Sequence, residues 1–130
     1  MTEPDQERAA IDAAMAVMKA NLKALNGLDS DAFAKTLHFP HYRLSGSNLQ
    51  VWDTPETYFD DFKARAGEGW HHTVWDKLEV IAAGADKVHL DVQFTRYRED
   101  DSSLGTFRSL WVITRIDGVW AALLRSTFAG

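Results

Sequence analysis

Two apolar segments at the end of the chain, 107–116 and 119–128, are joined by Asp117-Gly118. This dipeptide suits a two-residue type I′ turn, so the pattern predicts an antiparallel β-hairpin. Counting outward from the turn gives apolar residues on both faces: Trp111, Ile113, Ala122 and Leu124 on one, and Leu110, Val112 and Leu123 on the other. A sheet with one face in water alternates apolar and polar residues. Both faces therefore need a cover, and we expect helices of the same chain on one and a second copy, in a homodimer, on the other.

The segments before the hairpin follow an order of helices and then long strands. Asp29 is a suitable N-cap for a short second helix, and Asp53 with Glu56 is a capping-box-like start for a third, which ends at Gly67-Glu68-Gly69. Strands of ten or more residues in a small domain indicate a sheet that bends strongly. The expected helices are 6–26, 29–37 and 53–66. A small hairpin pairs 42–45 with 49–52, and two long strands follow at 70–82 and 87–98.

The composition narrows the classes of function. The 130 residues fit a single domain spanning 1–130, and the absence of cysteine excludes a disulfide framework, a thiolate metal site and a cysteine nucleophile. A net charge of −5 argues against nucleic acid or an anionic membrane as the main partner. No apolar run reaches the ~18 residues of a membrane span, and the polar, acidic start MTEPDQER is unlike a secretory signal, which favours a cytoplasmic location. The sequence has no phosphate-binding glycine loop or dinucleotide motif, so no cofactor is expected.

The element order resembles the nuclear transport factor 2-like fold over nearly the whole chain. Three local sequences are similar to those of SnoaL-like members: FPHYRLSG, FTRYRED and SLWVITRIDGVWAALLRSTFA. The resemblance implies an α+β fold, in which a cone-shaped, curved antiparallel sheet wraps around N-terminal helices and leaves a pocket at the wide end. That fold contains enzymes, binding proteins and transport factors, so it does not supply the function.

A residue-by-residue alignment with ketosteroid isomerase, a member of that fold, argues against the mechanism of that enzyme. The general base of that enzyme is an aspartate before a proline, where this chain has Phe39-Pro40, and its second acidic position aligns with Val112. Neither residue exchanges a proton, so that mechanism is not supported. The same alignment implies that one face of the closing hairpin lines the cavity: Arg108, Leu110, Val112, Leu123, Arg125 and Thr127. The Trp111 face would then meet the partner subunit.

Arg125 and Arg108 are candidate ligand-binding residues. A guanidinium among apolar side chains is costly unless it is paired, and it could clamp a ligand carboxylate with two hydrogen bonds. The alternative is an internal salt bridge or a position at the rim. Tyr58 and Trp52 are candidates to line an apolar cavity, although core packing explains them as well.

His38 and His41 flank the position of the general base in the resembling enzymes, and histidine titrates in the useful range. Either could transfer a proton if it points into the cone; a surface or structural role is the alternative. His71-His72 and the His89 and Asp91 pair do not have the ligand number of a metal site, so no metal is expected.

Two hypotheses remain open at this stage. The first is a small-molecule-binding protein that holds an acidic or carbonyl compound, with cofactor-free acid/base chemistry such as isomerisation, dehydration, cyclisation or hydrolysis if it is an enzyme. The second is a non-catalytic binding or interaction module whose cone is filled by aromatic side chains. A cavity of several hundred cubic ångströms with converging polar groups would favour the first.

Overall fold

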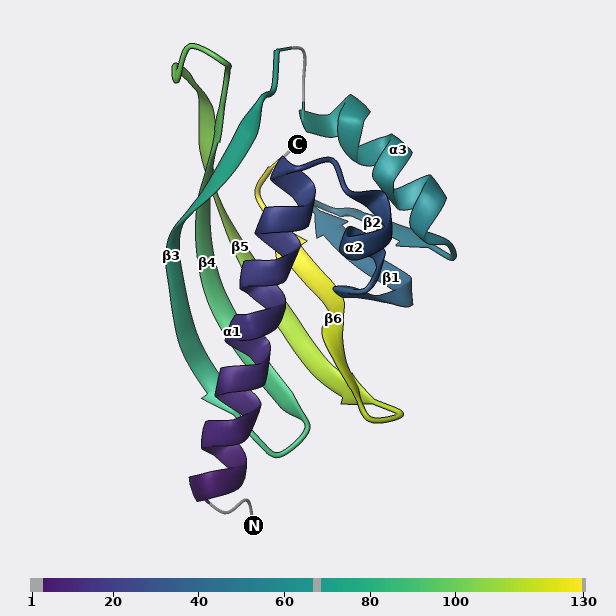
Figure 1. Ribbon diagram of the computed structural model, residues 1–130, viewed down its shortest axis with the longest axis vertical. Helices are drawn as coiled ribbons and strands as arrows, with labels where there is room; N and C mark the ends of the chain where they lie inside the picture. The colour runs from purple at the N-terminus through teal and green to yellow at the C-terminus, as the bar shows by residue number, and fades with distance from the viewer. Residues whose placement is uncertain (1–3, 67–68, 130) are drawn as a thin grey trace.

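A six-stranded curved sheet and three helices make up the computed structural model, which describes residues 4–66 and 69–129 (Figure 1). The strand order is β2-β1-β6-β5-β4-β3, and every neighbouring pair is antiparallel except β1 and β6, which are parallel. The elements in chain order are α1 (Pro4–Asn26), α2 (Ser30–Ala34), β1 (Leu37–Ser45), β2 (Asn48–Trp52), α3 (Pro55–Ala66), β3 (His72–Ala83), β4 (Lys87–Tyr97), β5 (Ser103–Ile116) and β6 (Val119–Thr127).

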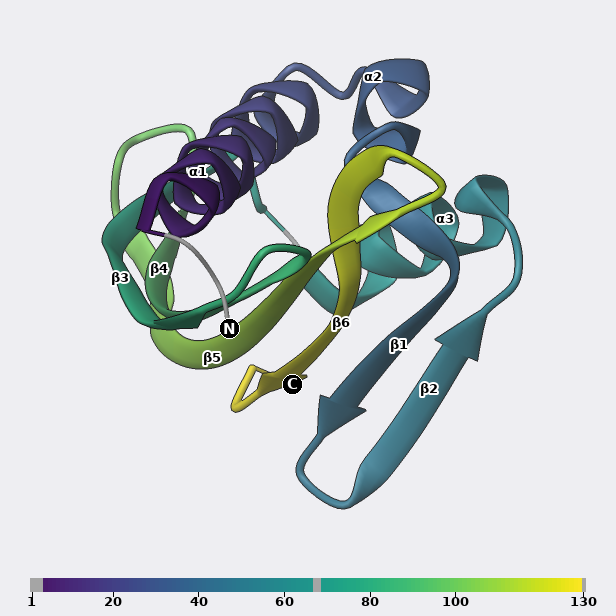
Figure 2. The ribbon, with the colours of Figure 1, turned by 90° about the horizontal axis from the view of Figure 1, so that it is seen from below.

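The sheet curls around the long helix α1, which lies along its concave face (Figure 1). Seen from below, β3, β4 and β5 curve beneath α1, while the β1–β2 hairpin extends away from it (Figure 2). The helix α3 contacts α2 and β2 and lies beside one end of the curled sheet. The core forms between α1 and the concave face, and this arrangement confirms the predicted α+β cone.

Side-chain caps fix two of the helix boundaries. Asp29 accepts a hydrogen bond from the backbone N–H of Ala32 at 3.1 Å, so the predicted N-cap of the second helix is confirmed. The predicted start of the third helix at Asp53 is wrong by one residue, because the Oγ1 of Thr54 accepts from the N–H of Thr57. The predicted helix end at Gly67-Glu68 lies outside the described residues.

The closing hairpin has the predicted turn. Both turn residues have positive φ, 52° at Asp117 and 78° at Gly118, as a type I′ turn requires. The pairing of Ile113 with Ala122 is also confirmed. Beyond that pair the register shifts, because β6 has one extra residue, Leu123, at a β-bulge.

The bulge changes which side chains share a face. Val112 pairs with Leu124, and Trp111 pairs with Arg125, where regular counting places Leu124 opposite Trp111. Since paired residues in an antiparallel sheet point to the same side, Arg125 lies on the Trp111 face. Regular alternation could not predict this, because a bulge moves every later residue of its strand to the other face.

The predicted assignment of the two faces is wrong for β5. Trp111 is 1% exposed and packs in the core under the helices, whereas Leu110 is 38% exposed on the convex face. The cause is that Trp111 and Ile113 join the concave core with Leu90 and Val92 of the neighbouring strand. The face that we assigned to the partner subunit is therefore the inner one.

Two further properties of the described residues concern membranes and metals. None of the helices in 4–66 and 69–129 is long and apolar enough to cross a membrane. Within the same residues, no three His, Cys, Asp or Glu side chains gather closely enough to hold a metal ion.

Candidate binding site

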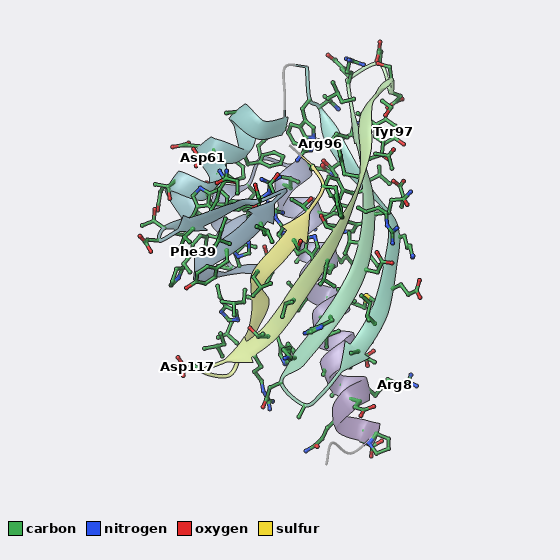
Figure 3. The ribbon with its side chains drawn as sticks, turned by 180° about the vertical axis from the view of Figure 1, so that it is seen from behind. Arg8, Phe39, Asp61, Arg96, Tyr97 and Asp117 are labelled. Carbon is green, nitrogen blue, oxygen red and sulfur yellow. The ribbon has the colours of Figure 1, made fainter. Side chains whose placement is uncertain are left out.

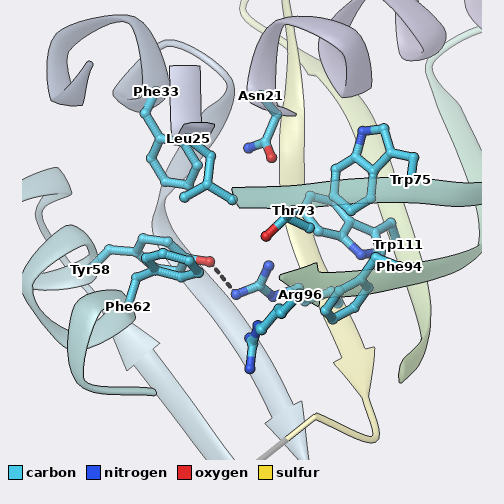
Figure 4. Close-up of a pocket in the computed structure, with 11 residues that line it drawn as sticks. Asn21, Leu25, Phe33, Tyr58, Phe62, Thr73, Trp75, Phe94, Arg96 and Trp111 are labelled. Atoms are coloured by element: carbon cyan, nitrogen blue, oxygen red, sulfur yellow. Dashed lines mark hydrogen bonds between the residues drawn. The ribbon is translucent and has the colours of Figure 1, made fainter. Parts of the chain in front are cut away.

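A small cavity lies where α1, α3 and the concave face meet (Figure 4). The space between its lining atoms, mouth included, is about 340 Å³, of which about 30 Å³ can hold the centre of a water molecule. That inner space suffices for one or two waters. The residues around it come from every layer of the fold: Asn21, Leu25, Phe33, Tyr58, Phe62, Thr73, Trp75, Phe94, Arg96, Trp111 and Arg125.

Arg125 is held in the cavity wall by two aromatic residues. Its guanidinium donates a hydrogen bond to the hydroxyl of Tyr58, marked by the dashed line in Figure 4. The guanidinium carbon lies 5.4 Å from the centre of the Tyr58 ring and 4.9 Å from that of Trp111. A cation over aromatic faces is stabilised by the ring quadrupoles. Arg125 and Tyr58, both predicted as ligand-binding candidates, are thus brought together.

Arg96 is a second guanidinium in the same wall, and the sequence reasoning missed it. It is 6% exposed, and its guanidinium carbon lies 5.9, 5.5 and 5.3 Å from the ring centres of Phe62, Phe94 and Phe107. Strand alternation was the signal that could have found it, since Arg96 follows Leu90, Val92 and Phe94 on the inner face of β4.

The charges of the lining are all of one sign. Among the described residues that line the cavity, two are arginines and none is an aspartate or glutamate. The aromatic walls keep bulk water away from the two guanidiniums. Electrostatic attraction is stronger in such a surrounding than in bulk solvent. The lining is thus suited to a ligand with a negative or strongly polarised oxygen.

Three neutral polar side chains complete the wall. Asn21 donates from Nδ2 to the Oγ1 of Thr36 at 2.9 Å, and Thr73 accepts from the Nε1 of Trp70 at 3.0 Å. The Nε1 of Trp111 is buried, and no acceptor for it exists within 4–66 and 69–129. A buried donor without an acceptor is uncommon in folded proteins and points to a water or a ligand atom.

Four of the predicted ligand-binding residues lie elsewhere. Arg108 is on the convex face, with a side chain 67% exposed and its Nη2 3.3 Å from Asp91 Oδ2. Leu110 and Val112 share that face, and Leu123 is the bulge residue; none of the four lines the cavity. The physical reason is the orientation of β5, whose odd-numbered residues face the helices.

Trp52, a predicted cavity residue, lies behind the wall. Its Nε1 donates to Asp61 Oδ2 at 2.7 Å, and its ring packs edge-on against Tyr58 with 4.8 Å between centres. Trp52 therefore supports the position of Tyr58 without lining the cavity.

Neither predicted catalytic histidine lines the cavity. His38 Nε2 is 2.9 Å from the carbonyl of Thr114, and His41 Nδ1 is 3.1 Å from the carbonyl of Ala122. A carbonyl only accepts, so each of these ring nitrogens carries a hydrogen. His41 is completely buried and packs edge-on against Tyr58 with 5.4 Å between ring centres. Both imidazoles thus hold strands together.

The convex face carries an apolar area that the sheet register gathers from four strands. We name it the outer apolar patch. Its members are aligned by strand pairing or packed beside the aligned ones: Tyr42, Leu44, Leu49, Val51, Leu110, Val112, Leu124 and Phe128. Side chains of the convex face are drawn in Figure 3. Of this patch, Phe128 is the most exposed residue.

An ion-pair network borders the patch on β3 and β4. Lys77 donates to Asp91 Oδ2 at 2.9 Å and lies 3.2 Å from Glu79. The hydrogen bond from Lys77, together with the charge of Arg108, holds the pKa of the Asp91 carboxyl below its usual value, and the same bond raises the pKa of Lys77. The partners of Asp91 are exposed, so the network contributes little to stability.

Solved structures with the same architecture are available for comparison. A protein of unknown function with a cystatin-like fold from Nostoc punctiforme matches 98% of this chain and 93% of its own, with a TM-score of 0.72 and 14% identity. A nuclear transport factor 2-like protein from Cytophaga hutchinsonii matches 92% and 97%, with a TM-score of 0.70 and 20% identity. A proposed ketosteroid isomerase from Shewanella frigidimarina matches 88% and 94%, with a TM-score of 0.68 and 13% identity.

These likenesses establish the fold, which is nuclear transport factor 2-like, also described as cystatin-like. The fold predicted from the resemblance is thereby confirmed. No protein-family model matches the sequence, and no curated protein matches it either. At such identities the comparison concerns the backbone, and the chemistry has to be argued from the cavity itself.

Proposed function

We propose that this chain is a SnoaL-like small-molecule-binding domain whose cone holds a compact, mainly apolar compound by an acidic or carbonyl group. The observation that carries the proposal is the pair of guanidiniums, Arg125 and Arg96, in one aromatic wall that has no carboxylate among its described lining residues. A planar guanidinium matches the geometry of a carboxylate and can donate two hydrogen bonds to it.

The size of the cavity limits the ligand. Apolar walls with a few polar groups are typical of small-molecule sites, but such sites usually measure several hundred cubic ångströms. Here the converging polar groups are present while the inner space is about 30 Å³. A ligand the size of a single ring therefore fits only if the side chains at the mouth move apart. The mouth is included in the 340 Å³.

The proposal is for binding and does not extend to proton transfer by His38 or His41. Both imidazoles lie outside the cavity lining, and each has a ring nitrogen committed to a backbone carbonyl. If turnover occurs, the polar groups in contact with the substrate would be those of Tyr58 and Arg125, whose mutual hydrogen bond places a hydroxyl beside a cation.

A homodimer through the convex face is the second part of the proposal. Exposed apolar areas of this kind commonly mark protein interfaces. The outer apolar patch runs across β2, β1, β6 and β5 and includes Leu49, Val51 and Phe128, which are all more than a third exposed. A second copy would cover these side chains, whereas a monomer leaves them in water.

The binding proposal is tested with benzoate and benzamide, two probes of the same shape of which only benzoate is charged. Isothermal titration calorimetry on the wild type should show tighter binding of benzoate. Arg125→Met should weaken benzoate about tenfold or more, since hydrogen bonds to charged groups contribute about 1.5–3 kcal/mol. Arg108→Met, a matched change on the convex face, should leave the affinity unchanged. Equal benzoate affinity in the wild type and Arg125→Met would refute the clamp.

A further inference from the structure

The orientation of one buried amide adds a second requirement for the ligand. Asn21 is 1% exposed and lines the cavity from the α1 side. In Figure 4 its amide points from α1 into the space above Thr73, opposite the guanidiniums. Which amide atom faces the cavity decides whether that side of the cavity accepts or donates a hydrogen bond.

The hydrogen bonds around Asn21 determine which of its amide atoms faces the cavity. The hydroxyl of Thr36 lies 2.6 Å from the carbonyl oxygen of Phe33, and because a carbonyl only accepts, the hydroxyl must donate its hydrogen there. Thr36 Oγ1 can then only accept from the amide of Asn21, 2.9 Å away, so the amide group facing Thr36 is the NH₂. The group left toward the cavity is the carbonyl oxygen Oδ1, for which the described residues provide no donor.

The opposite wall has the reverse polarity. Arg96 and Arg125 are donors only, and the Nε1 of Trp111 is a buried donor that no described residue satisfies. The cavity therefore presents donors on the sheet side and an acceptor on the helix side. Buried polar groups are normally paired, so a molecule that fills this space should complete both sides.

We propose that the ligand carries an acidic group toward the guanidiniums and, at its other end, a hydroxyl or amino group that donates to Asn21 Oδ1. The inference rests on the proposed function, and it narrows the ligand class to compact hydroxy acids or amino acids with an apolar, ring-sized body. Thr36 is a positioning residue in this scheme: it does not line the cavity, and it fixes the amide by accepting from it.

The test uses pairs of probes that differ in the donor alone. The 3- and 4-hydroxybenzoates are compared with 3- and 4-methylbenzoates, which have the same charge and nearly the same size. For at least one pair, calorimetry on the wild type should give an affinity at least about fivefold higher for the hydroxy compound, as expected when only one analogue can donate to the cavity-facing acceptor. Equal affinities for both pairs would overturn the inference and would indicate that Asn21 faces only a bridging water.

Two variants of Thr36 separate its effect on the orientation of the Asn21 amide from a general loss of structure at the site. Thr36→Ser keeps the hydroxyl and should keep the hydroxy-over-methyl preference. Thr36→Val removes the acceptor, so the amide can take either orientation, and the preference should fall to about one while benzoate affinity stays within about twofold. A preference unchanged in Thr36→Val would contradict the inference.

Failure of the two proposals can be told apart. If benzoate binding depends on Arg125 but hydroxyl and methyl probes bind alike, the binding function stands and the inference about Asn21 falls. If neither benzoate nor any substituted benzoate binds, the proposed function itself is refuted, and the inference with it.

Discussion

Arg125 lies directly opposite Trp111 on the neighbouring strand, and its guanidinium carbon is 4.9 Å from the centre of the indole. Arg125 follows the bulge in β6, so this contact places a residue beyond the bulge in the cavity wall. It also locates Trp111 in the interior, whereas the alignment with ketosteroid isomerase had implied that this residue meets a partner subunit.

Trp111→Glu should unfold the protein. The substitution removes a large core side chain, which typically costs about 3–5 kcal/mol, and buries a carboxylate in its place. Such a loss approaches the total stability of a small domain, about 5–15 kcal/mol. Circular dichroism during urea unfolding would measure it. Leu110→Glu, the same change on the exposed side of the same strand, should leave a folded protein; a stable Trp111→Glu fold would contradict the observed packing.

The outer apolar patch gives a separate prediction about assembly. Leu110→Glu should shift a dimer toward monomers, because it places a charge within the apolar part of the proposed interface. Light scattering at several protein concentrations would detect the change in mass. Val119→Glu introduces the same charge at an exposed apolar residue next to the Asp117-Gly118 turn, and it should not affect assembly. A monomeric wild type at high concentration would rule out the dimer.

Tyr58→Phe should destabilise the protein by about 1.5–3 kcal/mol. The substitution keeps the ring that stacks in the core but removes the hydroxyl that accepts from Arg125. Hydrogen bonds to charged groups contribute about that much, and part of the loss comes from the guanidinium left behind. Thermal unfolding measures the effect. Tyr42→Phe, which removes a hydroxyl on the convex face, serves as the control and should change stability by less than about 0.5 kcal/mol.

Asn26 holds the start of β3 to the end of α1. Its Nδ2 donates to the carbonyl of Thr73, and its Oδ1 accepts from the N–H of Thr73, both at 2.8 Å. Asn26→Ala removes both bonds and should cost about 1–3 kcal/mol. Hydrogen exchange at the Thr73 amide should accelerate strongly, whereas Asn48→Ala at the exposed start of β2 should leave it unchanged. Slow exchange in Asn26→Ala would show that the strand start is held by other contacts.

The pKa of the Asp91 carboxyl should lie below its usual value of 3.8, and the largest cause is the hydrogen bond that it accepts from Lys77. Since its pKa is lowered in the folded state, the network stabilises the protein above about pH 3.8, and that contribution disappears as the pH falls through the folded pKa. Lys77→Met should raise the pKa of Asp91, which NMR titration of the carboxyl carbon can follow. Lys35→Met, which changes the residue that follows α2 and is not part of the network, should have no effect on it.

The sequence was sufficient for the order of elements and for the type I′ turn, because both depend on local patterns. Helical spacing up to Asn26 and two positive-φ residues at Asp117-Gly118 are properties of short segments. The N-cap at Asp29 is local in the same sense. The one-residue error at Asp53 arose because two neighbouring residues, Asp53 and Thr54, are both good caps.

The candidate site was predictable only in part, because it depends on contacts between distant strands. Arg125 and Tyr58 were identified from their types, but Arg125 reaches the cavity through a bulge that no periodic pattern indicates. Two apolar faces on β5 left its orientation undetermined, and the choice of Leu110 over Trp111 as the inner face was wrong. The role of Asn21 depends on Thr36, fifteen positions away.

The extra residue in β6 also has an evolutionary meaning. If the bulge were lost and Leu123 paired with Val112, Leu124 would lie opposite Trp111 and position 125 would point outward, so that the cone would lose a positive charge without any arginine being mutated. Changes of ligand preference in such a scaffold can therefore arise from a shift of strand register at a bulge, which a comparison of the residue at position 125 alone would not detect.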